Sequence, residues 1–128
     1  MTRGIYLALS NPISGGSEVE FNRWYDHVHS PEALNYPGFV EARRYRLSQE
    51  QIRDQGLPAP YRYAVVYDVE SVERIPECRE FAPILAAASR EFVSPTIDAT
   101  GVFAYVFEEI SRITQPRELF GPDREDNG

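Results

Sequence analysis

The sequence contains one cysteine and two histidines among its 128 residues, which limits the chemistry open to it. A single cysteine, Cys78, cannot form a disulfide within the chain, a pattern typical of a reducing compartment. A structural zinc site needs more ligands than His27 and His29 can supply with one thiol. The pair Gly15-Gly16 lacks the lysine and the spacing of a phosphate-binding loop. We therefore expect no metal site and no cofactor.

Positive charge and long apolar runs are also scarce. The chain has 13 basic and 20 acidic residues and a net charge of -7, which argues against a nucleic-acid partner. No apolar run approaches the length that spans a membrane, and the first residues lack the pattern of a signal peptide. We expect a cytoplasmic protein with neither nucleic acid nor membrane as a partner.

What is present fits one globular domain, because 42% of the residues are hydrophobic and 26% are charged. Alternation and turn residues predict strands over 3–10, 39–47, 61–69 and 100–110, and helical regions over 18–29 and 71–92. This β-α-β-β-α-β order is typical of an α+β, ferredoxin-like domain with a four-stranded antiparallel sheet and both helices on one face. We assign the domain to residues 1–110 and a polar tail to 111–128.

The first and last predicted strands are apolar on both faces. In the first strand Ile5 and Leu7 alternate with Tyr6, and in the last strand Phe103 alternates with Val102. Two helices can cover one face of the sheet only, so the second face needs another cover. A second copy of the chain is the commonest cover for a soluble protein, and we expect a homodimer with sheet packed on sheet.

The segment from Ser17 to Leu47 carries the most informative pattern. Ser17 followed three residues later by Glu20 forms a capping box, which predicts the start of a helix. Pro31 predicts that this helix ends near His29. Apolar side chains at helical spacing predict one buried face, made of Phe21, Trp24, Tyr25 and Val28.

A polar stripe lies beside this apolar face, roughly 90° around the helix at ~100° per residue. Its members are Asn22, Asp26 and His29. A polar stripe on the shoulder of a buried face is where a helix would line a pocket. His27 points to the other side and is expected in solvent. The unperturbed pKa of histidine, about 6.5, suits proton transfer near neutral pH, which makes His29 the candidate acid/base group.

Four short motifs stand together in this segment: Phe21-Asn-Arg-Trp-Tyr-Asp-His-Val-His29, Pro31, Pro37-Gly38-Phe39 and Arg43-Arg44-Tyr45. They resemble the EthD-like branch of the dimeric α+β barrel superfamily. The motifs cover about residues 17–47, and the strand order extends the resemblance to nearly the whole chain. It implies a ferredoxin-like monomer that pairs into a β-barrel, with a small-molecule cavity between the helices and the concave sheet.

Relatives in that superfamily differ widely in chemistry. They include cofactor-independent decarboxylases and cyclases of aromatic polyketide pathways, cofactor-free quinone-forming monooxygenases, muconolactone isomerases and haem-handling branches. Haem binding through His29 is conceivable there, but nothing else in this sequence supports it. The resemblance therefore constrains the fold far more than the reaction.

The predicted catalytic group consists of three residues on one helix. His29 would transfer the proton, and Asp26, three residues earlier, would fix the tautomer of its imidazole. Tyr25 would donate to a developing enolate or phenolate oxygen, and Asn22 would orient a carbonyl. The alternatives are a structural hydrogen bond for His29, a solvated carboxylate for Asp26 and a core position for Tyr25.

Further candidates for substrate binding are Asn22, Trp24, Tyr6, Tyr63 and Arg43. The aromatic members of this set would equally well fill the core or the dimer interface. Arg43 would bind a substrate carboxylate or form an ion pair with Glu41 or Glu70.

Three functions remain open on the sequence. The first is a cofactor-independent enzyme that cyclises, isomerises or decarboxylates a polyketide-like or phenolic small molecule through His29. The second is a cofactor-free quinone-forming monooxygenase, and the third is a non-catalytic dimeric binding or accessory protein. An acid/base enzyme should hold His29 in a pocket with a polar partner, whereas a binding protein tolerates it in bulk water.

Overall fold

The computed structural model describes residues 1–53, 56 and 58–121, and its elements follow the predicted order. The strands are β1 (Gly4–Ser10), β2 (Phe39–Arg46), β3 (Tyr63–Val69) and β4 (Phe103–Glu108). The helical elements are α1 (Glu18–Trp24), η1 (Tyr25–His29), α2 (Ser30–Ala33), η2 (Val72–Arg74), α3 (Ile75–Ala88) and η3 (Ala99–Gly101). The predicted ferredoxin-like α+β fold is confirmed.

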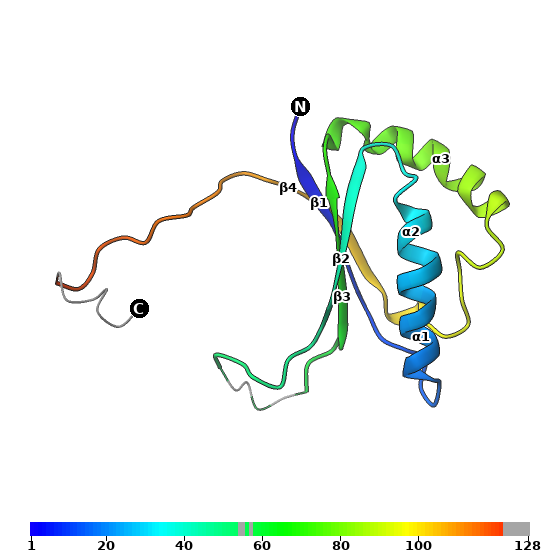
Figure 1. The fold of residues 1–128 in the computed structure, drawn as a ribbon, viewed down its shortest axis with the longest axis horizontal. Coiled ribbons are helices and arrows are strands. Elements are labelled where there is room, and N and C mark those ends of the chain that lie inside the picture. The colour runs from blue at the N-terminus through cyan, green and yellow to red at the C-terminus, as the bar shows by residue number, and fades with distance from the viewer. Residues whose placement is uncertain (54–55, 57, 122–128) are drawn as a thin grey trace.

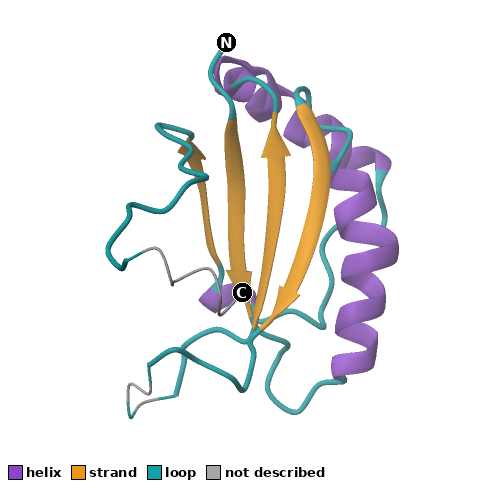
Figure 2. Ribbon diagram, turned by 60° about the vertical axis from the view of Figure 1, so that its left-hand side comes forward, coloured by secondary structure: helices purple, strands orange, loops and turns teal. Residues whose placement is uncertain are grey.

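The four strands form one antiparallel sheet in the order β2-β3-β1-β4. Figure 1 shows this sheet on edge, with α1, α2 and α3 all on one side of it. Figure 2 shows the strands side by side, with the helices beside and behind them. The predicted tail 111–128 is described as far as residue 121, has no helix or strand there, and leaves the sheet on the side away from the helices (Figure 1). No helix in the described part of the chain is long and apolar enough to cross a membrane.

The core lies between α1 and the central strands. Phe21 is fully buried, and Trp24 and Tyr25 are each 3% exposed, as the apolar spacing predicted. They pack against Val65 and Tyr67 on β3, both 1% exposed. The hydroxyl oxygen of Ser17 accepts a hydrogen bond from the amide of Glu20 at 3.1 Å, which confirms Ser17 as the cap, while the Glu20 carboxylate accepts from Arg23 Nε at 2.9 Å.

The prediction that the first helix ends at His29 is wrong, because α2 continues it to Ala33. The five residues of η1 form a π-helical turn, in which the amide of Ser30 donates to the carbonyl of Tyr25. This wider turn sets Pro31 in the first turn of α2, where a missing amide hydrogen is tolerated. The proline therefore follows a widened turn instead of breaking the helix.

The sheet face away from the helices carries many apolar side chains, as the two-sided strands predicted, together with the charged residues Glu41, Arg43 and Asp68. Strand register places its apolar side chains together: Ile5, Leu7, Leu9, Tyr45, Val66, Phe103, Tyr105 and Phe107. We call this surface the open face. Tyr105 is 59% exposed and Phe107 is 46% exposed, and a group of large side chains exposed in this way is more informative than a single one.

Gly38 sets the turn into β2, and its backbone φ of +83° lies in the left-handed region. A Cβ atom at this position would meet nothing closer than 3.7 Å, so a side chain would be unfavourable there only because of the left-handed backbone conformation. We expect Gly38→Ala to lower the free energy of unfolding by about 1–2 kcal/mol in urea denaturation. Gly101→Ala, at an ordinary φ, is the matched control; equal losses in the two variants would contradict this explanation.

Candidate functional site

His29 is half-buried against three aromatic rings. Its ring centroid lies 4.3 Å from that of Phe92, 4.7 Å from Trp24 and 5.2 Å from Tyr25. Its Nδ1 lies 2.7 Å from the carbonyl oxygen of Phe92, and since a carbonyl only accepts, Nδ1 carries the proton. Burial lowers the pKa of His29, against opposing effects of the Phe92 carbonyl and Glu32. At neutral pH the imidazole is therefore uncharged, and its Nε2 is the basic nitrogen.

The carbonyl of Phe92 that contacts His29 lies in the segment that follows α3. Trp24 donates its indole N–H to the carbonyl of Glu91 at 2.5 Å, so Trp24 and His29 bond two consecutive carbonyls of one loop. The predicted helix over 71–92 is wrong at its end, because α3 stops at Ala88. Side-chain donors from the first helix satisfy the carbonyls of Glu91 and Phe92, which replaces the amides that a longer helix would offer.

The structure gives Asp26 and His29 different partners. Asp26 Oδ1 accepts a hydrogen bond from Arg44 Nη1 at 3.0 Å, and Asn22 Oδ1 accepts one from Arg44 Nη2 at 2.9 Å. The π-helical turn explains this separation, because its extra residue rotates His29 away from the line through Asn22 and Asp26. The expected Asp26–His29 hydrogen bond is therefore replaced by two separate contacts, and the polar stripe divides between Arg44 and Phe92.

Arg44 is a residue that the sequence did not single out. Its guanidinium carbon lies 4.5 Å from the ring centroid of Tyr25, 5.5 Å from that of Tyr63 and 5.7 Å from that of Phe21. Tyr63 also accepts a hydrogen bond from Asn22 at 3.3 Å, so two predicted site residues meet here. Because side chains alternate along a strand, Arg43 and Arg44 lie on opposite faces of the sheet, and the register shows that Arg44 faces the helices.

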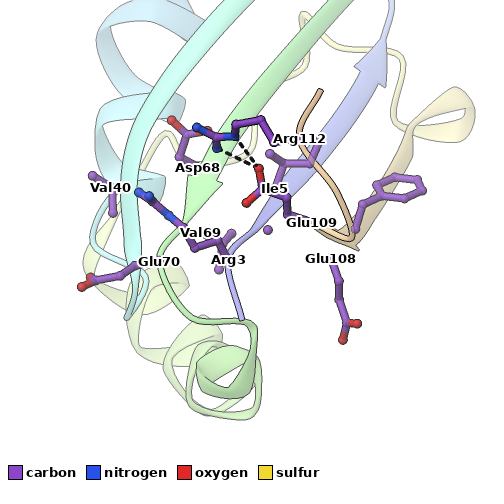
Figure 3. A pocket seen from close by; sticks show the side chains of 11 residues that line it. Arg3, Ile5, Val40, Asp68, Val69, Glu70, Glu108, Glu109 and Arg112 are labelled. Atoms are coloured by element: carbon purple, nitrogen blue, oxygen red, sulfur yellow. Dashed lines mark hydrogen bonds and ion pairs between the residues drawn. The ribbon is translucent and has the colours of Figure 1, made fainter. Parts of the chain in front are cut away.

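Arg43 faces the other way, onto the open face. It forms two hydrogen bonds with Asp68, at 2.6 and 3.1 Å, which lower the pKa of that carboxyl. The expected contact with Glu41 is present at 3.5 Å. A pocket of about 300 Å³ lies at this end of the open face. Figure 3 shows its lining side chains, with Arg112 paired to Glu109 near Asp68. The sheet thus separates Arg43 from His29.

Tyr6 lies apart from both groups, in a cavity of about 300 Å³ between α3 and the sheet. The cavity is lined by Tyr6, Tyr36, Phe39, Ile75, Cys78, Arg79, Ala82 and Val106. Burial raises the pKa of Tyr6, so its hydroxyl stays protonated at neutral pH. The ring of Tyr36 lies 6.5 Å from that of Phe92, which in turn stacks on His29. His29 is not among the residues that line this cavity, and the ring of Phe92 lies between the imidazole and the ring of Tyr36.

The remaining predicted residues have mainly structural positions. Tyr25 and Trp24 are core residues, as the alternative interpretation held, and burial raises the pKa of Tyr25. His27 is exposed, as predicted. Within residues 1–53, 56 and 58–121 no group of three or more His, Cys, Asp or Glu side chains is placed to hold a metal ion.

Comparison with known proteins identifies solved structures with the same fold. No family model matches the sequence, and no curated protein matches it. An EthD family protein from Bacillus halodurans has a TM-score of 0.56 at 12% identity and covers 86% of this chain and 100% of its own. A dimeric ferredoxin-like protein of unknown function from Thermobifida fusca has a TM-score of 0.53 at 16% identity, over 84% of this chain and 92% of its own. This chain therefore shares the ferredoxin-like fold of these proteins.

A third solved structure shows how far function varies on this fold. The heme-degrader MhuD from Mycobacterium tuberculosis, with two hemes bound in its active site, has a TM-score of 0.53 at 21% identity. It covers 87% of this chain and 99% of its own. At such identities the likeness establishes the architecture, and the activity has to be argued from the side chains.

Proposed function

We propose that this chain is a cofactor-independent enzyme that acts on a phenolic or polyketide-like small molecule, with His29 as its acid/base group. The observation that carries the proposal is the state of the imidazole. The Phe92 carbonyl fixes the proton on Nδ1, and burial lowers the pKa, so Nε2 is unprotonated at neutral pH. A half-buried base with a fixed tautomer is suited to general-base catalysis.

The chemistry that this base supports is proton transfer next to a carbonyl group. Nε2 would take a proton from the carbon beside a substrate carbonyl, and the electron pair of that C–H bond would move to the carbonyl oxygen as an enolate. The enolate carbon would then attack a second carbonyl in a cyclisation or be reprotonated in an isomerisation. In each case the imidazolium returns the proton, so the enzyme ends unchanged.

The cavity between α3 and the sheet has the size and lining that suit an aromatic substrate. Its walls are largely apolar and include the rings of Tyr6, Tyr36 and Phe39. Its volume of about 300 Å³ is at the lower end of the range for small-molecule sites. The protonated hydroxyl of Tyr6 would donate a hydrogen bond to a phenolate or enolate oxygen.

We further propose that the chain acts as a homodimer. The open face exposes large apolar side chains on both edge strands, Tyr45 on β2 and Tyr105 and Phe107 on β4. Contiguous apolar surface of this kind normally marks an interface. A second copy, packed sheet on sheet, would cover it.

The reaction class is tested by turnover with and without oxygen. Phenolic and polyketide-like carbonyl compounds are incubated with the enzyme under argon and under air, and products are followed by mass spectrometry. We expect equal product under both gases, with loss of water, loss of carbon dioxide or unchanged mass. Product that requires oxygen would replace this proposal with a quinone-forming monooxygenase, and product that requires added hemin would contradict cofactor independence. Saturable binding without any product would leave a binding protein.

A further inference from the structure

A polar cleft opens where the end of β2 meets the first helix, away from the aromatic cavity. Its volume is about 360 Å³, and it is lined by Asn22, Asp26, Arg44, Tyr45, Arg46 and Tyr63. Neither His29 nor Tyr6 is among these residues. The function of this cleft is therefore separate from the acid/base proposal.

The cleft has a fixed cation at its base. The side chain of Arg44 is 14% exposed, and Asp26 and Asn22 hold the guanidinium through one N–H each. The ring of Tyr25 packs against it at 4.5 Å from its centroid. A guanidinium carries five N–H donors, and these two bonds use two of them. Arg44 thus presents further donors in a preset orientation, at little additional entropic cost on binding.

A second arginine lies on the same face of the same strand. Strand register pairs Arg44 with Val65 and Arg46 with Tyr63, so both arginines face the helices. Two cations beside each other on one strand repel, and only Asp26, itself 53% exposed, offsets them within the lining. The cleft has one net positive charge in a chain whose net charge is -7. An anion bound there would relieve the repulsion.

We propose that this cleft binds the carboxylate of a small aromatic acid, with Arg44 and Arg46 as its charged ligands. One excess positive charge matches a monoanion such as a carboxylate better than a phosphate dianion. Guanidinium groups bind carboxylates through two parallel hydrogen bonds. The ring of Tyr63, on the same face of the sheet as both arginines, lines this cleft and offers surface to an aromatic body.

The test uses isothermal titration calorimetry of the intact protein with benzoate, its neutral isostere benzamide, and inorganic phosphate. Benzoate should bind more tightly than phosphate, benzamide should not bind measurably, and added salt should weaken benzoate binding. Absence of benzoate binding, equal binding of benzamide, or tighter binding of phosphate would each overturn the proposal.

Variants locate the site. Arg46→Gln should weaken benzoate binding by about 10- to 100-fold, the size of a lost charge-assisted hydrogen bond. Arg46 is the variant of choice because Arg44 also anchors the first helix through Asp26 and Asn22. Arg23→Gln is the matched control, since Arg23 pairs with Glu20 on the exposed side of α1. Equal benzoate affinity in Arg46→Gln and Arg23→Gln would show that the anion binds elsewhere. Because binding is measured without turnover, failure here leaves the role of His29 intact.

Discussion

Replacing His29 with asparagine should lower turnover by ~10²–10⁴-fold, the range for loss of a positioned proton-transfer group. Asparagine is the informative replacement, because its amide N–H can still donate to the carbonyl of Phe92 while it offers no titratable base. The loop after α3 then keeps its contact, and only the chemistry is lost. Turnover is measured on whichever substrate the oxygen-controlled assay identifies, with circular dichroism to confirm folding.

A structural role for the same histidine predicts a different set of results. His29→Ala removes both the base and the contact with the loop, whereas Trp24→Phe removes the neighbouring contact with Glu91 and leaves the imidazole in place. If His29 serves only to hold the loop, His29→Asn should keep its turnover and Trp24→Phe should lose as much as His29→Ala. That pattern would contradict acid/base catalysis by His29 and leave the imidazole with a structural role only.

The pH dependence of the wild type provides a second readout of His29. Because burial lowers its pKa, the base stays unprotonated below the ordinary value of about 6.5, and the acid limb of the rate profile should fall there. The same shift makes the free energy of unfolding depend on pH, because the unfolded chain binds the proton of His29 more readily than the folded chain does. The stabilisation from the buried neutral imidazole is complete above about pH 6.5 and is lost as the pH falls below it. His29→Asn should abolish both effects.

The sequence predicted the fold well because its signals were local. The cap at Ser17, the apolar spacing through Phe21 and the alternation along the strands each depend on neighbours in the chain, and each predicted its element. The two-sided apolar strands also predicted the open face. Those features need only a period of 3.6 or 2 residues and the turn residues between them.

The site was predicted less well because it depends on geometry that no local period describes. The π-helical turn separates His29 from Asp26, and a helical wheel drawn at the α-helical period cannot anticipate it. Phe92 reaches His29 from 63 positions away, through a segment that was expected to be helical. Arg44 differs from Arg43 only in which sheet face it occupies, and that depends on the whole sheet. Such long-range placements decide chemistry without leaving a sequence pattern.

The apolar side chains of the open face should also determine whether the chain dimerises. Leu7 in the central strand β1 pairs with Val66 on β3 and with Tyr105 on β4, so an apolar band crosses three strands. A face this apolar is unfavourable in water and favourable in a sheet-to-sheet contact. A dimer buries it on both copies at once, because a two-fold axis sets the same patch against itself.

Tyr105→Asp should therefore dissociate or unfold the protein, because it would bury an unpaired carboxylate in that contact. Sedimentation equilibrium should give the wild type twice the 14.6 kDa mass of the chain at micromolar concentration, and the variant the mass of one chain or a loss of folded signal. Ile84→Asp is the matched control, since Ile84 is 64% exposed on α3, on the side of the sheet that carries the helices. It should leave the dimer intact. A wild type that stays monomeric, or equal dissociation in the two variants, would contradict an interface on the open face.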